Sequence, residues 1–260
     1  MLPDRAGVVV TGGGNGIGRA IAHRLVAAGA RIVVNDLDGD AAARVAEEVG
    51  GLAVAGDAAS ADGVQALVDA ARDHLGSIDV FFANAGIARG DAATATDADF
   101  ETSWQVNVMA HVRAARALLP EWLEQGEGRF VATASAAGLL TMLGSAPYTL
   151  SKHAAVAHAE WLSATYRHRG VVVQALCPQG VRTAMLDDSG PAGDVTLTET
   201  AITPERVAAT VFDALEDDRF LILPHPEVAD YVRAKAADPD RWLGGMNRLQ
   251  QRVEELRADF

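Results

Sequence analysis

Three residues in the middle of the sequence have the types and spacing of an acid–base site. Tyr148 and Lys152 stand four residues apart in a helical pattern, so their side chains should share one helix face. A free tyrosine titrates near ~10, but a nearby ammonium favours its phenolate form. Ser135 follows a β-branched segment, at the strand end where doubly wound sheets bind ligands. We therefore predict proton transfer by Tyr148, a tyrosine pKa lowered by Lys152, and a hydrogen bond from Ser135 to a substrate oxygen.

A glycine-rich turn near the N-terminus, Thr11–Gly18, joins the first predicted strand to the first predicted helix. Its spacing, Gly12-x3-Gly16-x-Gly18, differs from the GxGxxG dinucleotide motif. Glycines let backbone amides approach a pyrophosphate, and the helix that follows directs the positive end of its dipole at that anion. An ordinary turn is the alternative, but the position between strand and helix favours a nucleotide site.

Asp36, at the end of the second predicted strand, favours a dinucleotide without a 2′-phosphate. A carboxylate there accepts hydrogen bonds from the adenine ribose and repels a 2′-phosphate. The neighbouring positions hold Asn15 and Leu37 rather than basic residues, and only Arg19 nearby would compensate the charge. The sequence therefore predicts NAD rather than NADP, although Asp36 alone would also fit a solvated strand end.

Short β-branched segments alternate with longer alanine-rich helical patterns along most of the chain. Continuous apolar strands separated by helices predict a parallel sheet covered on both faces. We expect an α/β fold, a doubly wound (Rossmann) seven-stranded parallel sheet with helices on both faces. The predicted strands are Val8–Val10, Arg31–Asn35, Gly51–Ala55, Ile78–Phe82, Arg129–Thr133, Val171–Leu176 and Arg219–Leu223. The predicted helices lie near Gly18–Ala28, Asp40–Val49, Ala61–His74, Ser103–Glu124, Tyr148–His168 and Pro204–Glu216.

Two stretches do not follow this alternation. Thr183–Thr203 is long and rich in turn residues, which is typical of a substrate lid loop. The tail, residues 226–260, shows two amphipathic helical patterns, Glu227–Ala237 and Arg241–Leu256, and would cap the domain, cover the active site or meet another subunit. No low-complexity linker separates either stretch, so residues 1–260 are expected to form a single dinucleotide-binding catalytic domain.

Composition and charge exclude several classes of protein. Apolar residues make up 49% of the 260 residues and charged residues 22%, an ordinary globular balance. The net charge of −13 disfavours nucleic acid and anionic membrane surfaces as partners. Met1–Ala6 shows no targeting pattern and no stretch reaches the roughly 18 apolar residues of a membrane span, so a cytoplasmic protein is expected. The single cysteine, Cys177, permits no internal disulfide, and the seven histidines form no metal-binding pattern.

The ordered set of motifs resembles the short-chain dehydrogenase/reductase family, from about Gly7 to Leu223. A Tyr/Lys pair alone is usually a surface accident, but here it is combined with the glycine turn, Asp36 and a serine at a strand end. The glycine turn is similar to the family's TGxxxGxG motif, and Ser135, Tyr148 and Lys152 have the spacing of its catalytic residues. Further matches are Gly56-Asp57-Ala58, Asn84-Ala85-Gly86, Asn107 and the segment Pro178–Thr183.

The resemblance implies a role for each matched position. Tyr148 would remove the alcohol proton as hydride passes to the nicotinamide, Ser135 would steady the substrate oxygen, and Lys152 would bind the nicotinamide ribose. Asn107 would hold a water that relays protons from Lys152. Asp57 would contact the adenine, and residues 178–183 would hold the nicotinamide carboxamide. The implied catalytic residues are Asn107, Ser135, Tyr148 and Lys152. The implied cofactor-binding residues are Gly12, Asn15, Gly16, Ile17, Gly18, Asp36, Leu37, Asp57, Ala58, Asn84, Ala85, Gly86, Tyr148, Lys152, Pro178, Gly180, Val181 and Thr183.

Some positions depart from the family pattern or leave two roles open. Gln179 replaces the glycine that usually follows the proline, and Leu223-Pro224-His225-Pro226 with the long tail replaces a glycine-rich ending. His225 would either contact substrate or belong to an ordinary loop. Cys177 is expected to pack in the interior rather than to react.

Apolar residues in two regions suggest a substrate pocket and a subunit interface. Met142, Leu143, Met185 and Leu186 would line a hydrophobic pocket or pack locally. The apolar helix faces near Ala110–Leu119 and Ala154–Leu162 would be core, although in the resembling family such helices form the interface of a homo-oligomer. The resemblance therefore implies a dimer or a tetramer.

The leading functional hypothesis is an NAD(H)-dependent oxidoreductase that interconverts a secondary alcohol and a ketone. The apolar lid residues favour a hydrophobic, uncharged small molecule as substrate. One alternative is a 3-oxoacyl-thioester reductase, although the net charge of −13 disfavours polyanionic substrates. The other is a non-catalytic NAD-binding sensor or scaffold, which would need Asp36 and the glycines but not the Ser/Tyr/Lys group.

Overall fold

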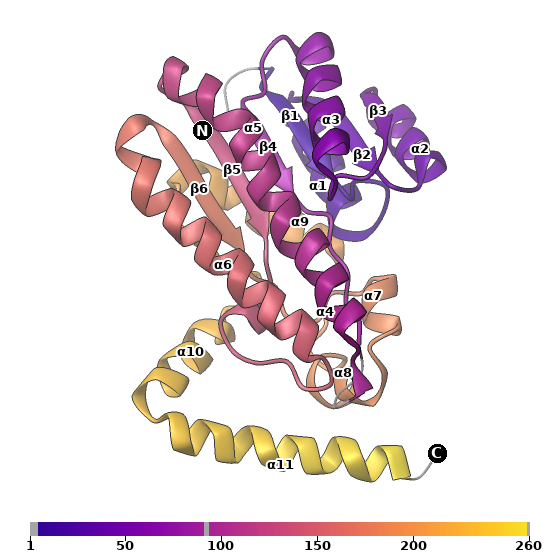
Figure 1. Cartoon of the computed structure of the whole chain (residues 1–260), viewed down its shortest axis with the longest axis vertical. Coiled ribbons are helices and arrows are strands. Elements are labelled where there is room, and N and C mark those ends of the chain that lie inside the picture. The colour runs from indigo at the N-terminus through magenta and orange to yellow at the C-terminus, as the bar shows by residue number, and fades with distance from the viewer. Residues whose placement is uncertain (1–4, 91–93, 259–260) are drawn as a thin grey trace.

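The computed structural model describes residues 5–90 and 94–258. Residues 1–4 and 259–260, on which the expectation for the N-terminus and the end of the predicted tail fall, lie outside the described residues. Seven parallel strands form one sheet in the order β3-β2-β1-β4-β5-β6-β7 (Figure 1), which confirms the predicted doubly wound α/β fold. The strands are β1 Gly7–Thr11, β2 Arg31–Asp36, β3 Leu52–Ala55, β4 Val80–Ala83, β5 Gly128–Thr133, β6 Val171–Leu176 and β7 Leu221–Ile222.

Polar side chains cap the start of most long helices. Asp38, Ser60, Thr96, Ser145 and Thr203 each accept a hydrogen bond from a backbone N–H of the first turn. The helices are α1 Gly16–Val26, α2 Gly39–Val49, α3 Ala61–Leu75, α4 Asp97–Trp104, α5 Ala110–Gln125, α6 Ala146–Tyr166, α7 Ala184–Asp187, α8 Gly190–Thr196, α9 Pro204–Asp217, α10 Glu227–Ala237 and α11 Pro239–Ala258. A π-helical turn, η2 Gln105–Met109, and two 3₁₀ turns, η3 Ala136–Gly138 and η4 Arg167–Arg169, complete the set.

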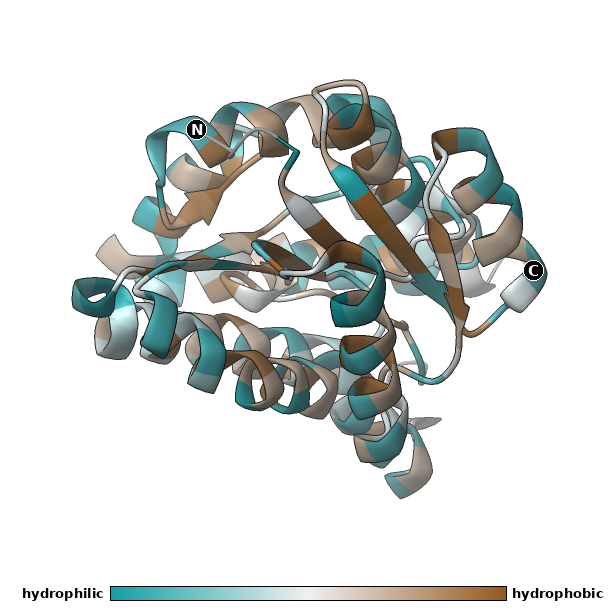
Figure 2. Cartoon of the chain, turned by 90° about the horizontal axis from the view of Figure 1, so that it is seen from above, coloured by the Kyte–Doolittle hydropathy of each residue, from teal (hydrophilic) through white to brown (hydrophobic). Residues whose placement is uncertain are grey.

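Two layers of helices cover the sheet because its strands are apolar on both sides. All five residues of β1 are buried. One apolar cluster joins the sheet to α3, α5 and α6, and a second joins its other face to α1, α2 and α9. Figure 2 shows hydrophobic strands between these layers. The carboxyl ends of the strands therefore meet at one edge of a rigid core, and the loops that follow them are held close together.

The structure corrects the expectation of an irregular lid loop at Thr183–Thr203. This segment contains α7 and α8, and Val181 pairs with Ile202 at its base. Asp188 and Ser189 separate the two helices, and α8 begins at Gly190, whose φ is 59°. Helices of four and seven residues are too short to give a hydrophobic period that the sequence reveals.

Smaller differences concern the ends of elements. β7 comprises only Leu221–Ile222 rather than Arg219–Leu223. The predicted helix Ser103–Glu124 is part of a longer unit in which η2 joins α4 to α5. In the tail, α10 has the predicted bounds, whereas α11 is longer than Arg241–Leu256 at both ends.

The tail lies at one end of the molecule, where α11 crosses beside α8 (Figure 1). Lys235 of α10 donates hydrogen bonds to the carbonyl oxygens of Leu139 and Leu140, both at 3.0 Å. Val228 packs against Ala136 and Leu140. Helix α10 is therefore attached to the segment that follows Ser135. Within residues 5–90 and 94–258, no helix combines the length and apolar character needed to cross a membrane.

Candidate functional site

A cavity of about 2280 Å³ opens at the carboxyl ends of the strands. Its wall is formed by the segments after β1 to β6, the start of α6, the segment with α7 and α8, and the tail. A pocket for one drug-sized ligand has a volume of about 300–1,000 Å³. The cavity therefore has room for a large ligand together with a second, smaller one.

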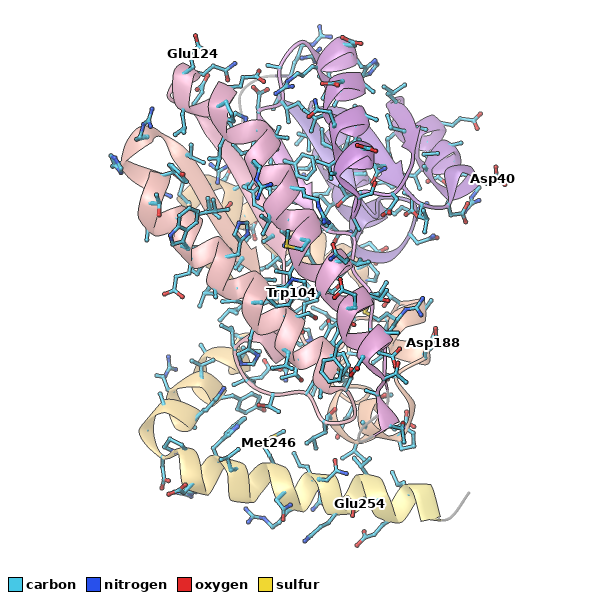
Figure 3. All side chains as sticks on the ribbon, in the orientation of Figure 1. Asp40, Trp104, Glu124, Asp188, Met246 and Glu254 are labelled. Carbon is cyan, nitrogen blue, oxygen red and sulfur yellow. The ribbon has the colours of Figure 1, made fainter. Side chains whose placement is uncertain are left out.

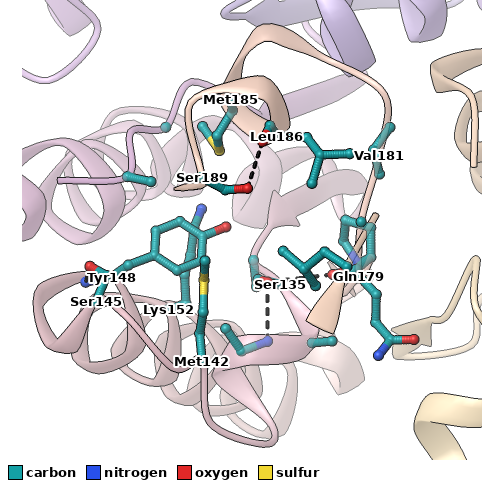
Figure 4. Close-up of a pocket in the computed structure, with 18 of the residues that line it drawn as sticks. Ser135, Met142, Ser145, Tyr148, Lys152, Gln179, Val181, Met185, Leu186 and Ser189 are labelled. Atoms are coloured by element: carbon teal, nitrogen blue, oxygen red, sulfur yellow. Dashed lines mark hydrogen bonds between the residues drawn. The ribbon is translucent and has the colours of Figure 1, made fainter. Parts of the chain in front are cut away.

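Ser135, Tyr148 and Lys152 lie on one wall of this cavity (Figure 4). Both α6 residues point to the same side because they are one helical turn apart. Lys152 Nζ lies 5.6 Å from the centroid of the Tyr148 ring and donates a hydrogen bond to the Thr133 carbonyl at 2.9 Å. All three side chains are buried. The structure thus brings together the predicted base, ammonium and hydroxyl.

Two local features place this group. Ser145 caps α6 by accepting the N–H of Tyr148 at 3.2 Å, and its own hydroxyl donates to the Arg89 carbonyl at 2.7 Å. Gly138 packs directly on α6, since a Cβ at that position would lie 2.4 Å from the Lys152 carbonyl oxygen. A side chain there would separate the segment after Ser135 from the helix that carries Tyr148.

Burial governs the titration of the group. It raises the pKa of Tyr148 above the ordinary value, and the neighbouring Ser135 hydroxyl opposes this only in part. Burial also lowers the pKa of Lys152 to about 8. The predicted lowering of the tyrosine pKa combines Lys152 with a positive nicotinamide ring, so it stays a prediction. Further positive charge beside Tyr148 is needed to stabilise its phenolate near neutral pH.

Asn107 lies behind the cavity wall, in the π-helical turn η2. Its Oδ1 accepts the Ile87 N–H at 2.9 Å, and its Nδ2 donates to the Ile87 carbonyl and to Ser151 Oγ, both at 2.9 Å. Gly86 leaves room for two polar groups, since a Cβ there would lie 3.2 Å from Lys152 Nζ and 3.3 Å from Asn107 Oδ1. Asn107 therefore holds the segment after β4 beside Lys152, and its predicted water-binding role stays a prediction.

Asn84 joins the ends of three strands. Its Nδ2 donates to the carbonyls of Thr11 and Gly12, at 3.0 and 3.2 Å, and its Oδ1 accepts the Thr133 hydroxyl at 3.1 Å. Gly18 is required by close packing, because a Cβ there would lie 2.2 Å from the Gly12 carbonyl oxygen. Gly12 itself has a φ of 59°, which favours glycine. These contacts fix the glycine turn against the adjacent strands.

Asp36 lies beside this turn. Its Oδ2 accepts the N–H of Gly14 at 2.9 Å and its Oδ1 accepts the N–H of Asp38 at 3.1 Å. Arg19 is directed elsewhere, since its guanidinium bonds to Glu48 at 2.9–3.0 Å. Arg19, the cation expected to compensate a phosphate next to Asp36, is therefore already paired with Glu48.

The cavity wall contains most of the predicted site residues. Among the predicted cofactor-binding positions, all except Gly18 line the cavity, and among the predicted catalytic residues all except Asn107 do so. Gly18 and Asn107 instead support the wall through the contacts described above. Within the described ranges, no group of three or more His, Cys, Asp or Glu side chains is arranged to hold a metal ion.

The structure separates the positions of Gln179, His225 and Cys177, whose roles the sequence leaves open. Gln179 lines the cavity, but its side chain lies beyond Ser135 and is directed away from Tyr148 (Figure 4). His225 is not part of the cavity wall, and its Nδ1 accepts the Gln179 N–H at 3.2 Å, which favours the loop alternative over substrate contact. Cys177 is fully buried, and burial raises the pKa of its thiol to about 12, consistent with packing.

Apolar side chains line the part of the cavity near α7 and α8. The four residues expected there, Met142, Leu143, Met185 and Leu186, all line it, which favours the pocket alternative over local packing. Of the three alternatives for the tail, the structure favours the one in which it covers the cavity, but the sequence did not single out the tail residues that reach the wall, which include Tyr231, Arg241, Trp242, Met246, Arg248 and Leu249. The three- and four-residue spacing of these α11 positions was a signal for one helix face, but not for what that face would cover.

A family model described as short chain dehydrogenase matches residues 6–193. Helix α9, β7 and the tail lie beyond this match. The chain is 37% identical over 254 residues to 1-deoxy-11-beta-hydroxypentalenate dehydrogenase of Streptomyces exfoliatus, covering 93% of this chain and 90% of that protein.

Two solved structures are similar over most of their length. A short chain dehydrogenase/reductase from Burkholderia phymatum in complex with NAD has a TM-score of 0.84 at 30% identity, covering 91% of this chain and 95% of that one. A 3-ketoacyl-(acyl-carrier-protein) reductase from Brucella melitensis complexed with NADH has a TM-score of 0.79 at 26% identity, covering 85% and 95%.

Proposed function

Because the chain belongs to the short-chain dehydrogenase family of oxidoreductases, we propose that it interconverts a secondary alcohol and a ketone with NAD(H) as cofactor. One observation carries the proposal: the Ser135, Tyr148 and Lys152 side chains share a cavity with Asp36. A sensor or scaffold would need the dinucleotide end of that cavity but not a buried Ser/Tyr/Lys group. The arrangement therefore favours an enzyme over the non-catalytic alternative.

The β1 end of the cavity fits a dinucleotide. Helix α1 begins without a side-chain cap and has no acidic residue in its first turn, so its N–H groups suit a pyrophosphate. A Cβ on Gly16 would lie 3.0 Å from Thr183 Cγ2, so glycine keeps the turn open at this point. Asp36 would accept the adenine ribose hydroxyls, and Asp57 and the segment 84–86 would contact the adenosine. Lys152 and the segment 178–183 would hold the nicotinamide half.

Bound NAD would supply the hydride acceptor and a positive charge that opposes the rise in the pKa of Tyr148 caused by burial. During alcohol oxidation, Tyr148 accepts the substrate hydroxyl proton. Ser135 Oγ accepts the Ala137 N–H at 3.1 Å, and its hydroxyl donates a long hydrogen bond of 3.4 Å to the Pro178 carbonyl. Rotation of that hydroxyl would exchange this long bond for one to the substrate oxygen. Lys152 keeps an ammonium near the tyrosine ring and favours its ionised form. During ketone reduction, Tyr148 returns the proton.

Two observations support NAD over NADP. Asp36 places a carboxylate where a 2′-phosphate would lie, and the Arg19 guanidinium is paired with Glu48. The two similar structures described above contain NAD and NADH.

The Streptomyces relative is named as a dehydrogenase of a hydroxylated compound, which favours alcohol oxidation. Reduction of a 3-oxoacyl thioester is the second candidate, favoured by the likeness to the Brucella reductase. The homo-oligomer and the cytoplasmic location stay predictions.

Nicotinamide absorbance tests the proposal directly. The full chain is incubated with NAD or NADP and a panel of hydrophobic secondary alcohols, and with NADH and the matching ketones or a 3-oxoacyl thioester. We expect turnover of at least one alcohol–ketone pair with NAD(H). Turnover of the thioester alone would support the second candidate. Silence with every substrate, together with measurable NAD binding, would support the sensor alternative.

Replacing Asp36 with serine and Leu37 with arginine is expected to reverse the cofactor preference. The serine removes the charge that repels a 2′-phosphate, and the arginine adds one that binds it. We expect the ratio of kcat/KM for NAD to that for NADP to fall at least about tenfold, the equivalent of one charge-assisted contact. The matched control is Asp40→Ser, because Asp40 is exposed and does not line the cavity. An unchanged ratio in the Asp36 variant would contradict the assignment.

A further inference from the structure

The tail presents a single face of α11 to the substrate end of the cavity. The α11 residues that line it are Arg241, Trp242, Gly245, Met246, Arg248 and Leu249. Steps of three and four residues place them on one side of the helix. Figure 3 labels Met246 on the side of α11 that is turned toward the body of the molecule. This face lies outside the family match at residues 6–193.

The polar groups of this face are hydrogen-bond donors without partners. Trp242 Nε1 is shielded from solvent and has no hydrogen-bond partner among the described residues. Arg241 and Arg248 are exposed at the cavity wall, and neither guanidinium forms a hydrogen bond or an ion pair within the described part of the chain. Indole and guanidinium groups donate hydrogen bonds and accept none. Such a face is suited to a group that only accepts, as a carboxylate does.

Open space between Arg241 and Arg248 would let one ligand contact both side chains. Arg241 and Arg248 are seven residues apart, which places them about 20° apart around the helix, with Gly245 between them on the same stripe. A Cβ on Gly245 would meet only an Arg248 guanidinium nitrogen, at 3.8 Å. The Arg248 side chain therefore folds back along the helix toward Arg241. No close packing contact and no positive φ requires glycine at position 245. The absence of a side chain there leaves open space between the two arginines.

Asp188 and Asp238, two carboxylates of the cavity wall, form no ion pair with either arginine. The Oδ1 of Asp238 instead accepts the backbone N–H of Arg241 at 3.0 Å as a cap for α11. In a chain with a net charge of −13, two unpaired arginines beside apolar side chains form a local site of opposite charge.

We propose that Arg241 and Arg248, with the Trp242 indole N–H, bind the carboxylate of an apolar substrate whose alcohol or ketone group reaches Tyr148. The substrate class is then a hydrophobic hydroxy acid or oxo acid, rather than the uncharged molecule expected from the sequence. Met142, Met185 and Met246 would contact its apolar body. This inference rests on the proposed function for the reacting end, whereas the carboxylate site is independent of turnover.

Calorimetric binding of adamantanecarboxylate and adamantanecarboxamide tests the site without turnover. The two probes share one apolar body and differ in charge. The full chain is titrated with each, with NAD present and again without it. Because the arginines are exposed and screened, we expect the carboxylate to bind about tenfold more tightly than the amide, an effect of one charge-assisted contact. Equal or tighter binding of the amide would overturn the proposal.

Variants assign the preference to the two arginines. We expect Arg241→Gln combined with Arg248→Gln to abolish the difference between the probes, chiefly by weakening the binding of the carboxylate. The matched control is Arg252→Gln, because Arg252 is exposed on the same helix but does not line the cavity. If the control loses the preference as fully as the double variant, the effect is one of overall charge and the proposal fails.

The turnover panel then separates this inference from the proposed function. A carboxylate preference that depends on the two arginines supports the site even if no alcohol is oxidised. Oxidation of neutral alcohols without any carboxylate preference in binding or in KM supports the function and overturns the site.

Discussion

Replacing Tyr148 with phenylalanine is expected to lower kcat about 10²–10⁴-fold, because acid–base catalysis by a positioned side chain contributes that much. The variant removes one oxygen from a buried ring and leaves the ring in place. We therefore expect the dissociation constant for NAD(H) to change little, and the loss to fall on kcat rather than KM. Nicotinamide absorbance under saturating cofactor measures kcat and KM, and calorimetry measures the dissociation constant for NAD(H).

The matched control is Tyr166→Phe. Tyr166 lies at the end of the same helix, packs against the core and does not line the cavity. We expect this variant to retain full activity and a similar melting temperature. If Tyr148→Phe kept activity within tenfold of the unmodified chain, another group would be the acid–base catalyst and the proposed mechanism would be wrong.

Replacing Lys152 with methionine is expected to lower kcat/KM by about 10²–10³, the cost of removing one positioned electrostatic group from a dry site. Lys152 supplies the only ammonium near the tyrosine ring in the described part of the chain. The methionine keeps the length of the side chain and removes the charge. We expect the remaining activity to rise toward higher pH, because burial raises the pKa of Tyr148 and the charge that opposes this is lost.

The same variant is expected to change how stability depends on pH. Burial lowers the pKa of Lys152 from 10.5 in the reference state to about 8 in the folded chain. Between these values the unfolded chain binds more protons than the folded one, so this group makes stability rise with pH. Integrated from about pH 7 to 9.5, the contribution is about 2 kcal/mol. Well below pH 8 the lysine is charged in both the folded and the unfolded chain, so the stability gained at higher pH is absent there.

Comparison with the variant isolates this contribution from Cys177. Burial raises the pKa of Cys177 from 9.0 to about 12, so its thiol lowers stability as pH rises above 9.0. Both chains contain Cys177, and its effect cancels in their difference. We expect the stability of the unmodified chain, relative to Lys152→Met, to increase by about 2 kcal/mol between about pH 7 and 9.5, measured by urea unfolding. A flat difference for Lys152→Met would contradict the assigned pKa.

The sheet could be predicted because the hydropathy patterns that specify its strands and helices involve residues close together in the sequence. Apolar strands and longer helical patterns alternate along the chain, and each pattern has its own period. The right-handed connection of parallel strands then limits the order to a few topologies. The sequence was weakest at Thr183–Thr203, where α7 and α8 are too short to show a period. There the pairing of Val181 with Ile202, a long-range contact, defines the segment.

The candidate site could be predicted in part because its residues recur at characteristic spacings. The four-residue step from Tyr148 to Lys152 and the glycines of the first turn are visible without coordinates. The supporting contacts are not visible, since Gly138 against Lys152 and Asn84 across three strands join residues far apart in the chain. The tail was predicted as helices, but its hydropathy did not indicate which surface it would cover.

The sequence by itself determined the fold class, the spacing of the Ser/Tyr/Lys group and the acidic residue at the second strand end, because short-range patterns specify all three. The tertiary structure decided the direction of the tyrosine pKa shift and the make-up of the substrate wall. A pKa in a dry site depends on how completely neighbouring elements remove water, which spacing does not encode. Likewise, Arg241 and Arg248 become part of a cavity only when α10 is attached beside Ser135 and brings α11 across α8.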